Sequence, residues 1–478
     1  MQRPLRGVGR PGDAPIRRAV SEDGGIEARA SKQTRMPAAR RRQTRKPAAG
    51  GSRGGVRAGR RGGQTLEHRI LVTATMCLLG FGAVMVYSAT SPTALLQGSG
   101  NGTGYLLKFV AYGALGLVLM RVLARDGVAR VQALVGPLLA VSFALVAAVH
   151  VPHLGVSVNG ARRWLGPGSL QFQPSELLKL ALVLYGATLL AVRPSRVRDL
   201  RELARPLLAV VGGACLLVVT EPDLGSAMVI AFTTAALLVA AGIPLRNLAI
   251  VAGTALGLVL LYALARPYAR ARLTSFLDPW AHASGSGFQA VQGQIAIGSG
   301  GLFGVGPGQS VQKIFYLPEA STDFILAVIA EELGAVGVCA LLFLYGLIAY
   351  AGLRVARGAR SLHSALIAVG ITSLIVSQAL LNVFAVLGLA PLTGVPLPLV
   401  SYGSSSMVMT LAAMGLLLNV AAGGTAHVRP VHSSRGAGAA KRGKPPGWSR
   451  EGEQDRDRGR RHSGARGAGA GGGRRAAS

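Results

Sequence analysis

The chain has 478 residues, of which 50% are hydrophobic and only 15% are charged, with a mean hydropathy of +0.42. Soluble domains carry about 25% charged residues, so this composition excludes an ordinary soluble enzyme and indicates a protein folded in lipid. The formal net charge is +31, and about two-thirds of the excess lies in the two ends of the chain.

Both ends of the chain are basic and unsuited to a folded core. Residues 1–68 hold 17 Lys or Arg against 5 Asp or Glu, and residues 426–478 hold 13 against 4. Both segments are rich in Arg, Gly, Ala and Pro, so we expect them to be disordered. Such tails can bind nucleic acid or anionic lipid, but the positive-inside rule explains them as cytoplasmic segments. We therefore expect no nucleic-acid partner.

Residues 69–425 form the membrane region, because apolar runs close to the ~20 residues that a bilayer-spanning helix needs follow one another there. The runs cover 70–90, 105–123, 131–149, 176–192, 206–220, 225–242, 247–265, 324–351, 364–388 and 402–422. They predict an all-α polytopic membrane protein of about ten transmembrane helices. A large extracytoplasmic loop, 266–323, separates the seventh helix from the eighth.

Basic residues in the short loops set the orientation in the bacterial plasma membrane. If there are ten spans, these loops all lie on the side of the two basic tails, so both termini are predicted to be cytoplasmic. The residues concerned are Arg121, Arg125, Arg130, Arg193, Arg196, Arg198, Arg201, Arg205, Arg246, Arg354, Arg357 and Arg360.

The outer loops also carry cations, which the same rule disfavours there. An anionic ligand at the outer surface would explain why they are kept. These residues are Arg162, Arg163, Arg266, Arg270, Arg272 and Lys313.

Common signatures of soluble enzymes are absent from the sequence, including the P-loop, the HExxH zinc motif and the GxSxG elbow. The stretch GSGGLFGVGPG at 298–308 is glycine-rich, but we interpret it as a flexible outer loop. The cysteines Cys77, Cys215 and Cys339 lie far apart in apolar runs, so we expect small buried side chains and no disulfide or metal site.

Two polar clusters flank the fourth to sixth spans on the outer side. In the first, 159–180, Glu176 and Lys179 are three residues apart and share one helix face. They predict either a local ion pair or a charged cavity. In the second, 220–227, Glu221 and Asp223 form either a solvated hairpin or part of a site.

A third cluster, 313–334, places Asp323 where the outer loop enters the eighth span. It is either a helix N-cap, for which Asp is preferred, or a general base or metal ligand. Glu331 and Glu332 follow inside the apolar run, where two carboxylates are costly unless a cavity or a partner satisfies them.

The fourth cluster, TGVPLPLVSYGSSSM at 393–407, follows Gln378 and Asn382 of the ninth span. Its Pro and Gly residues predict a broken or re-entrant segment, which membranes tolerate only where protein or a wet cavity surrounds it. The four clusters lie on one side of the membrane, so we expect one outward-facing site.

In this order, the clusters resemble the SEDS family, the shape, elongation, division and sporulation proteins typified by FtsW and RodA. The resemblance covers roughly 70–420 and rests on VQKIFYLPEASTDFI with AEELG, and on PLPLVSYGSSS. VMVYSAT in the first span is closer to FtsW than to RodA.

The resemblance implies a peptidoglycan glycosyltransferase that polymerises lipid II, the undecaprenyl-pyrophosphate-linked disaccharide peptide. It implies a divalent cation, Mg²⁺ or Mn²⁺, a class b penicillin-binding transpeptidase and other division proteins as partners, and a place at the division septum. The family's essential aspartate falls on Asp323, which is the predicted general base and a possible metal ligand. The predicted substrate-binding residues are Arg163, Glu176, Lys179, Asp223, Lys313, Glu319, Asn382 and Ser401.

The sequence departs from the family pattern at two positions. Ser321 replaces the His that usually precedes Thr-Asp, and Ser404 replaces a second Gly after Ser-Tyr-Gly. Three alternatives to division-linked polymerisation stay open: a lipid II transporter without bond chemistry, an elongation or sporulation enzyme, and a scaffold that recruits division proteins through its tails.

Overall fold

A computed structural model describes residues 65–98, 100–158, 161–166, 171–192, 194 and 199–424. Nearly all of the two predicted tails lies outside these residues. So do Arg193, Arg196 and Arg198 of the predicted inner loop, and the side chain of Arg205.

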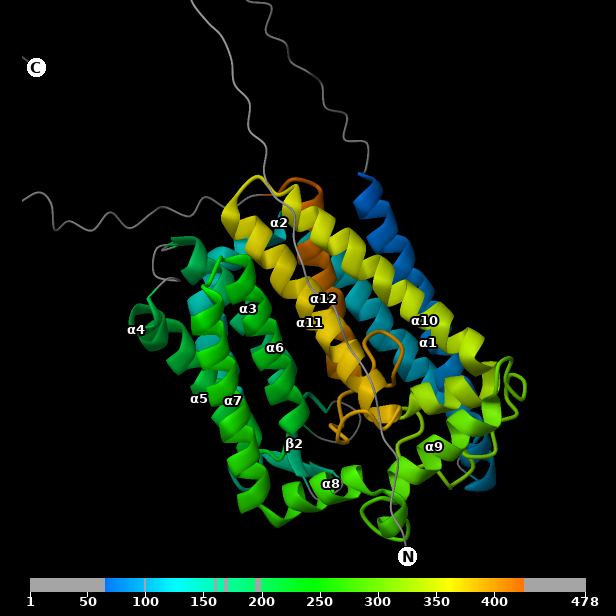
Figure 1. The fold of residues 1–478 in the computed structure, drawn as a ribbon. Helices are drawn as coiled ribbons and strands as arrows, with labels where there is room; N and C mark the ends of the chain where they lie inside the picture. Colours follow the sequence, from blue (N-terminus) through cyan, green and yellow to red (C-terminus); the bar gives the residue numbers. More distant parts are fainter. Residues whose placement is uncertain are drawn as a thin grey trace, which may run out of the picture. The chain divides into compact units, whose positions relative to one another are not determined.

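The described part of the chain is almost entirely helical, which confirms the predicted all-α class (Figure 1). Its helices are α1 (Leu66–Leu96), α2 (Thr103–Ala148), α3 (Pro174–Val192), α4 (Leu200–Leu203), η3 (Ala204–Leu208), α5 (Ala209–Thr220), α6 (Leu224–Ala240), α7 (Leu245–Ala265), α8 (Pro267–Leu277), η4 (Trp280–His282), α9 (Phe288–Gly300), α10 (Ile325–Arg357), α11 (Leu362–Val386) and α12 (Ser404–Ala421). One antiparallel hairpin joins β1 (Gly155–Val158) to β2 (Ala161–Leu165).

The helix bundle has two ends with different structures. Gln173 bonds to Ser405 through its backbone N–H (3.0 Å) and to Asp223 through its side chain (3.2 Å), which brings the starts of α3, α6 and α12 together. We call this the site end, because the β-hairpin, α8 and α9 also lie there (Figure 1). At the opposite end, which we call the tail end, Arg354 pairs with Glu67 at 3.2 Å.

Helix α2 is two crossings rather than one. Its start lies at the site end, where the rings of Tyr105 and Tyr402 are 5.5 Å apart. Its middle reaches the tail end, where Asn419 donates to the carbonyls of Ala124 and Arg125. The chain then returns to the site end, where His150 hydrogen-bonds to Thr220 at 2.9 Å. The reversal occurs at Asp126, whose φ of −134° and ψ of 24° break the helix.

The ten predicted spans are therefore all present in the described chain. Among the described residues seven helices are long and apolar enough to cross a membrane, and the shorter apolar helices Pro206–Thr220 and Leu224–Ala240 correspond to two more of the predicted spans. The tenth comes from the second half of α2. The protein is a polytopic membrane protein.

The predicted outer loop 266–323 contains helices that the sequence analysis missed. Helices α8 and α9 occupy much of it, and α9 includes the first residues of the glycine-rich stretch 298–308. The hydropathy pattern did not reveal them because both are too short or too polar to cross a bilayer.

Helix α10 is interrupted at Gly334, and the outer loop repairs the interruption. The backbone there has φ 67° and ψ −165°, a conformation open almost only to glycine. The carbonyls of Glu331 and Glu332 accept from the N–H groups of Val305 and Gly306, at 2.9 and 3.1 Å. The N–H of Ala335 donates to Gly301 in return, at 3.0 Å. The loop thus satisfies backbone groups that lipid could not.

This break divides α10 into two parts with different surroundings. Residues 325–332 are all buried in protein, whereas exposed apolar side chains begin at Ala335 and Val336. At 1.5 Å per residue the 23 residues from 335 to 357 span about 35 Å, enough for one bilayer crossing. The first part therefore belongs to the site end and not to the crossing.

The expectation for the cysteines is wrong at two positions. Cys77 and Cys339 are exposed and Cys215 is partly buried. In a membrane protein an apolar run can face lipid as well as the core, so hydropathy alone does not predict burial.

Replacing Gly334 with Ala is expected to destabilise the protein by about 2–4 kcal/mol, because a side chain there combines a strained backbone with a steric overlap. A Cβ atom at this position would lie 2.4 Å from the carbonyl oxygen of Leu302. Gly346→Ala in the same helix is the control, since nothing lies within 4 Å of its Cβ. Thermal unfolding in detergent measures both variants, and equal midpoints would contradict the argument.

Candidate active site

Asp323 lies at the site end, in the last turn of the outer loop before α10. The N-cap position of that helix is Phe324, and no side chain caps it by a hydrogen bond, so the N-cap interpretation of Asp323 is wrong. Asp323 lines a small cavity that opens to solvent. The cavity is also lined by Arg272, Gln289, Phe324, Asn382, Ala385, Val386, Leu392, Thr393, Gly394 and Val395.

The backbone around Asp323 is held by α11 and by the segment between α11 and α12. Asn382 donates its amide N–H groups to the carbonyls of Asp323 (2.7 Å) and Val395 (2.8 Å). Ser401 donates to the carbonyl of Thr322 at 2.6 Å and accepts from a backbone N–H. The predicted broken segment is thus buried protein that positions Asp323. The side-chain contacts of Asn382 and Ser401 position the chain.

The pKa of Asp323 is raised from its ordinary value to about 7. Burial is the main cause, and the charge of Glu319 adds to it, as does the more weakly acting Asp223. Arg163 and Arg272 oppose the rise. A carboxylate with a pKa near neutral pH is suited to accept a proton as a general base.

Strand β2 brings Arg163 to the same place. Its guanidinium donates to the backbone carbonyls of Glu221, at 3.1 Å, and Pro222. Gly394 lies between Arg163 and Asp323: a Cβ at Gly394 would be 3.3 Å from the Asp323 Oδ2 atom and 3.7 Å from the Arg163 guanidinium. With φ at +70°, this residue lets the backbone pass between the two charges.

The turn between α5 and α6 adds two carboxyl groups. Asp223 accepts from the N–H of Ser226 at 3.0 Å, and so caps α6, and it also accepts from Gln173. Glu221 is only 1% exposed, and neither of its carboxyl oxygens has a hydrogen-bond partner among the described residues. Burial and the neighbouring Asp223 raise the pKa of Glu221 to about 8, against the opposing effect of Arg163. The predicted solvated hairpin is therefore a buried turn.

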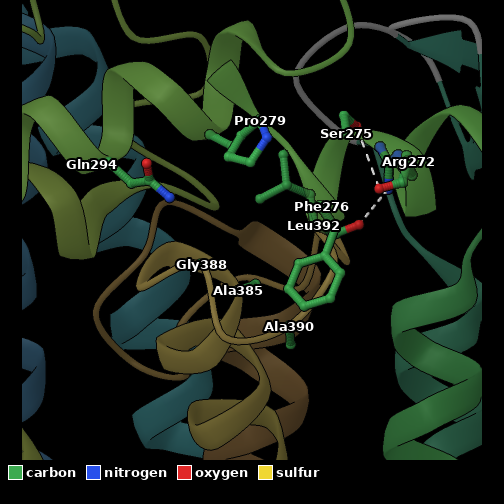
Figure 2. A pocket seen from close by; sticks show the side chains of 10 residues that line it. Arg272, Ser275, Phe276, Pro279, Gln294, Ala385, Gly388, Ala390 and Leu392 are labelled. Carbon is green, nitrogen blue, oxygen red and sulfur yellow. Dashed lines mark hydrogen bonds between the residues drawn. The ribbon is translucent and has the colours of Figure 1, made fainter. Parts of the chain in front are cut away.

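Helix α8 contributes Arg272, which joins the Asp323 cavity to a second one. The second cavity shares Arg272, Ala385 and Leu392 with the first and extends between α8, α9 and the end of α11. Figure 2 shows Arg272 bonded to the carbonyl of Leu392, at 2.9 Å. The sequence predicted Arg272 to be a cation of the outer loop, but its place beside the Asp323 cavity depends on the fold of α8.

Glu176 and Lys179 form the predicted ion pair, with 2.8 Å between them, and both are buried. Lys179 also lines a small separate cavity between α3, α6 and α11. The predicted ion pair is present, and a functional charged cavity stays a prediction. Neither residue lines the Asp323 cavity in the described part of the chain.

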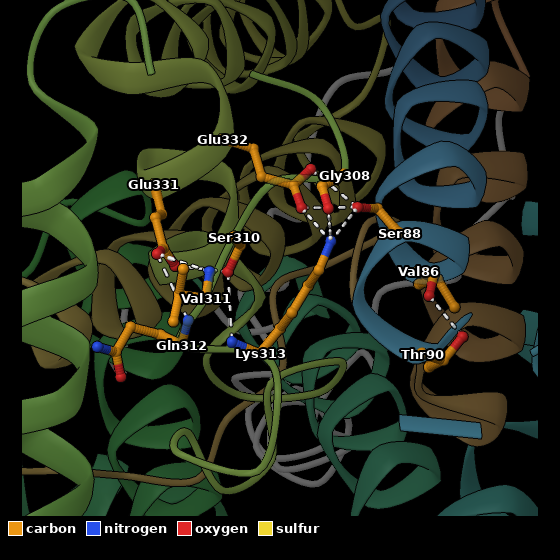
Figure 3. A network of polar contacts seen from close by, with 10 residues as sticks. All are labelled: Val86, Ser88, Thr90, Gly308, Ser310, Val311, Gln312, Lys313, Glu331 and Glu332. Atoms are coloured by element: carbon orange, nitrogen blue, oxygen red, sulfur yellow. Dashed lines mark hydrogen bonds and ion pairs between the residues drawn. The ribbon is translucent and has the colours of Figure 1, made fainter. Parts of the chain in front are cut away.

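Lys313 lies away from the Asp323 cavity. Its ammonium group contacts Glu332 at 2.7 Å, Ser88 at 3.1 Å and the carbonyl of Gly308 at 2.8 Å (Figure 3). Glu331 accepts from the Ser310 hydroxyl and from the backbone of Val311. These contacts account for both carboxylates of α10 without a route across the membrane. The substrate-binding role of Lys313 stays a prediction.

Residues 69–425 match the family of FtsW, RodA and SpoVE, described as cell cycle proteins. The chain belongs to this family.

Relatives within the family match most of the chain. A protein of Thioalkalivibrio sulfidiphilus named probable peptidoglycan glycosyltransferase FtsW is 42% identical over 76% of this chain and 94% of its own length. Stage V sporulation protein E of Bacillus subtilis is 37% identical over 75% of this chain and 97% of its own length.

Solved structures of the family share the fold. A chain from a peptidoglycan synthase complex that coordinates polymerization and crosslinking is 32% identical, with a TM-score of 0.61 over 73% of this chain and 96% of that chain. The rod shape determining protein RodA of Thermus thermophilus is also 32% identical, with a TM-score of 0.53 over 73% and 95%.

The two departures from the family pattern are compatible with the backbone of the site. The backbone carbonyl of Ser321 accepts from the N–H of Tyr402 at 2.9 Å, a bond that any side chain at 321 permits. Ser404 is the first residue of α12 and adopts a helical conformation, so glycine is not required there.

The described side chains alone do not form the kind of metal-ion site that the expected divalent cation would suggest. Among the described residues, no group of three or more His, Cys, Asp and Glu side chains could hold a metal ion. The positive charges of Arg163 and Arg272 instead act on the Asp323 carboxyl and favour its ionised form. The divalent cation stays a prediction from the family resemblance.

Glu221→Gln is expected to weaken the pH dependence of stability. Because the folded-state pKa of Glu221, about 8, lies above its ordinary value of 4.5, the unfolded chain releases this proton first. The stability of the wild type should therefore fall as pH rises from about 4.5 to about 8. Unfolding midpoints measured across this range should fall less steeply in the variant. Glu202→Gln, on the exposed surface, is the control, and parallel wild-type and Glu221→Gln curves would contradict the assignment.

Proposed function

We propose that the protein is a peptidoglycan glycosyltransferase of the FtsW type, which polymerises lipid II for septal wall synthesis. The observation that carries this proposal is the carboxyl of Asp323 in an open cavity, with a pKa near 7 and two arginines acting on it. Relatives named as peptidoglycan glycosyltransferases, at about 40% identity over most of the chain, support it.

In the proposed reaction Asp323 accepts the proton of the sugar 4-hydroxyl of one lipid II molecule. The freed oxygen attacks the anomeric carbon of the donor glycan, and the polyprenyl pyrophosphate leaves. Arg163 and Arg272 provide positive charge beside the reacting groups, which favours a pyrophosphate leaving group. A partly desolvated base with a pKa near the working pH makes the proton transfer efficient.

The site end is proposed to face the outside of the plasma membrane, where lipid II is polymerised. Arg125, Arg130, Arg354 and Arg357 lie toward the tail end, which the positive-inside rule assigns to the cytoplasm together with both termini. The fold shared with a chain of a peptidoglycan synthase complex supports a class b penicillin-binding transpeptidase as partner, with division proteins at the septum.

A divalent cation, Mg²⁺ or Mn²⁺, is proposed to be required by resemblance to the family. Protein side chains need supply only one or two ligands to such an ion, because substrate phosphates and water complete its coordination. EDTA is expected to abolish polymerisation, and added Mg²⁺ or Mn²⁺ to restore it. Unchanged activity in EDTA would contradict a cation requirement. The charge of the pyrophosphate would then be offset by Arg163 and Arg272.

Transport of lipid II without bond chemistry is the second candidate. The buried Glu176–Lys179 pair and its own cavity within the bundle favour it, because intramembrane charges often line transport routes. Liposomes that contain the protein and lipid II separate the candidates, since a transporter would move lipid II across the bilayer without forming glycan chains.

Asp323→Asn is expected to lower polymerisation by purified protein about 10²–10⁴-fold, the usual effect of removing a general base. The wild-type rate should rise with pH through a midpoint near 7, because only the deprotonated carboxylate accepts a proton. Asp126→Asn, at an exposed aspartate of the tail end, is the control and should leave the rate unchanged. Near-normal glycan synthesis by Asp323→Asn, measured with and without the transpeptidase, would exclude the proposed role.

A further inference from the structure

Three side chains from distant parts of the sequence meet at the site end. Lys313 of the outer loop, Glu332 of α10 and Ser88 of α1 bond to one another, and we call this group the latch (Figure 3). The Ser88 hydroxyl lies 2.7 and 2.8 Å from the two Glu332 oxygens. The latch thus ties the outer loop to two membrane helices at once.

The latch leaves Lys313 no spare donor. An ammonium group has three N–H donors, and Lys313 has three acceptors within bonding distance, from Glu332, Ser88 and Gly308. The side chains of Lys313 and Glu332 are each only 1% exposed. A ligand could reach this ammonium only by replacing one of these bonds, so the geometry disfavours a direct contact with substrate.

The neighbouring Glu331 fixes the same stretch of loop by different bonds. Its carboxylate accepts from the Ser310 hydroxyl at 2.5 Å and from the N–H groups of Val311 and Gln312 at 3.0 and 3.4 Å. Both glutamates lie about two turns after the start of α10. Residues 310–313 are therefore fastened to the helix that begins directly after Asp323.

The segment 313–323 is consequently held in place at both ends. The latch holds it at Lys313, and the start of α10 and the Ser401 bond to Thr322 hold it at Asp323. Glu319, inside the segment, has a φ of +56°, and its carbonyl accepts from the N–H groups of Thr322 and Phe324. These local bonds keep Glu319 near Asp323, and the bonds at Lys313 hold the other end of the segment.

We propose that Lys313, Glu332 and Ser88 are positioning residues, which hold the segment 313–323 so that Asp323 keeps its place in the cavity. The inference rests on the proposed function, because it assigns the latch a role in the same polymerisation reaction. Lys313 would then affect the reaction by positioning Asp323, and not by the substrate contact that the sequence predicts.

The charges that face Asp323 determine the sign of the effect. Glu319 from its own loop and Asp223 from the α5–α6 turn raise its pKa, as burial does, while Arg163 from β2 and Arg272 from α8 lower it. Opening the latch would loosen the segment and let water reach Asp323. Burial, the main cause that raises its pKa, would weaken while the arginines remain, so the pKa of Asp323 would fall.

The test uses a double variant, Lys313→Met/Glu332→Met, in the full-length protein. Removing both charges avoids a buried charge without a partner, which the single variants would create and which could prevent folding. The matched control is Glu67→Gln/Arg354→Gln, which removes an ion pair between the same two helices, α1 and α10, at the tail end. Thermal unfolding establishes that both proteins are folded.

Two measurements then report on the latch. The first is the pH dependence of polymerisation, with kcat and KM for lipid II determined separately. The second is hydrogen exchange of the backbone amides of residues 313–323, which needs no activity and can be repeated in the Asp323→Asn protein.

The double variant is expected to lose about tenfold or more in kcat at neutral pH, with a small change in KM, as a displaced base would cause. The midpoint of its pH–rate profile should fall by about one unit, and its 313–323 amides should exchange faster, while the control resembles the wild type. A lower kcat with an unchanged midpoint would show a merely structural role and overturn the proposal, as would unchanged exchange. If the wild type itself failed to polymerise, the exchange result would still decide whether the latch holds the segment.

Discussion

The need to satisfy every backbone polar group in a lipid-surrounded protein governs the site end of this structure. Helix α10 breaks at Gly334, and the outer loop supplies the bonds that the break removes. The segment between α11 and α12 is irregular too, and it is buried against the backbone of residues 321–323. Because these irregular segments bond to one another, their positions depend on each other, and Asp323 lies where they meet.

The polar residues of the bundle divide into two groups with different surroundings. Lys313, Glu331 and Glu332 have their hydrogen bonds made within the protein, and they hold segments together. Glu221 is buried and Asp323 partly buried, both with raised pKa values, and the Glu221 oxygens have no hydrogen-bond partner in the described chain. A buried carboxyl without partners, as at Glu221, is costly, and the raised pKa and cavity position of Asp323 are better explained by chemistry than by stability.

Opposing charges keep the Asp323 carboxyl near its titration point at neutral pH. Burial and Glu319 alone would favour the protonated acid, which cannot act as a base, and the two arginines alone would favour a weak base with a low pKa. The balance depends on loops and helices from four separate parts of the chain: β2, α8, the α5–α6 turn and the segment before α10. Small movements of any of them would change the proton affinity.

The sequence by itself determined the all-α membrane class, the ten crossings, the family, and Asp323 as the residue of interest. These follow from apolar runs, loop charges and local motifs, which are properties of neighbouring residues. It also predicted the Glu176–Lys179 pair, since three residues on a helix define a shared face. Only the tertiary structure decided that Arg272 joins Asp323, that Lys313 binds Glu332 and Ser88, and that Asn382 and Ser401 hold the backbone. Those contacts connect residues far apart in the chain, and their distances are set by helix packing and by the break at Gly334, neither of which a local pattern encodes.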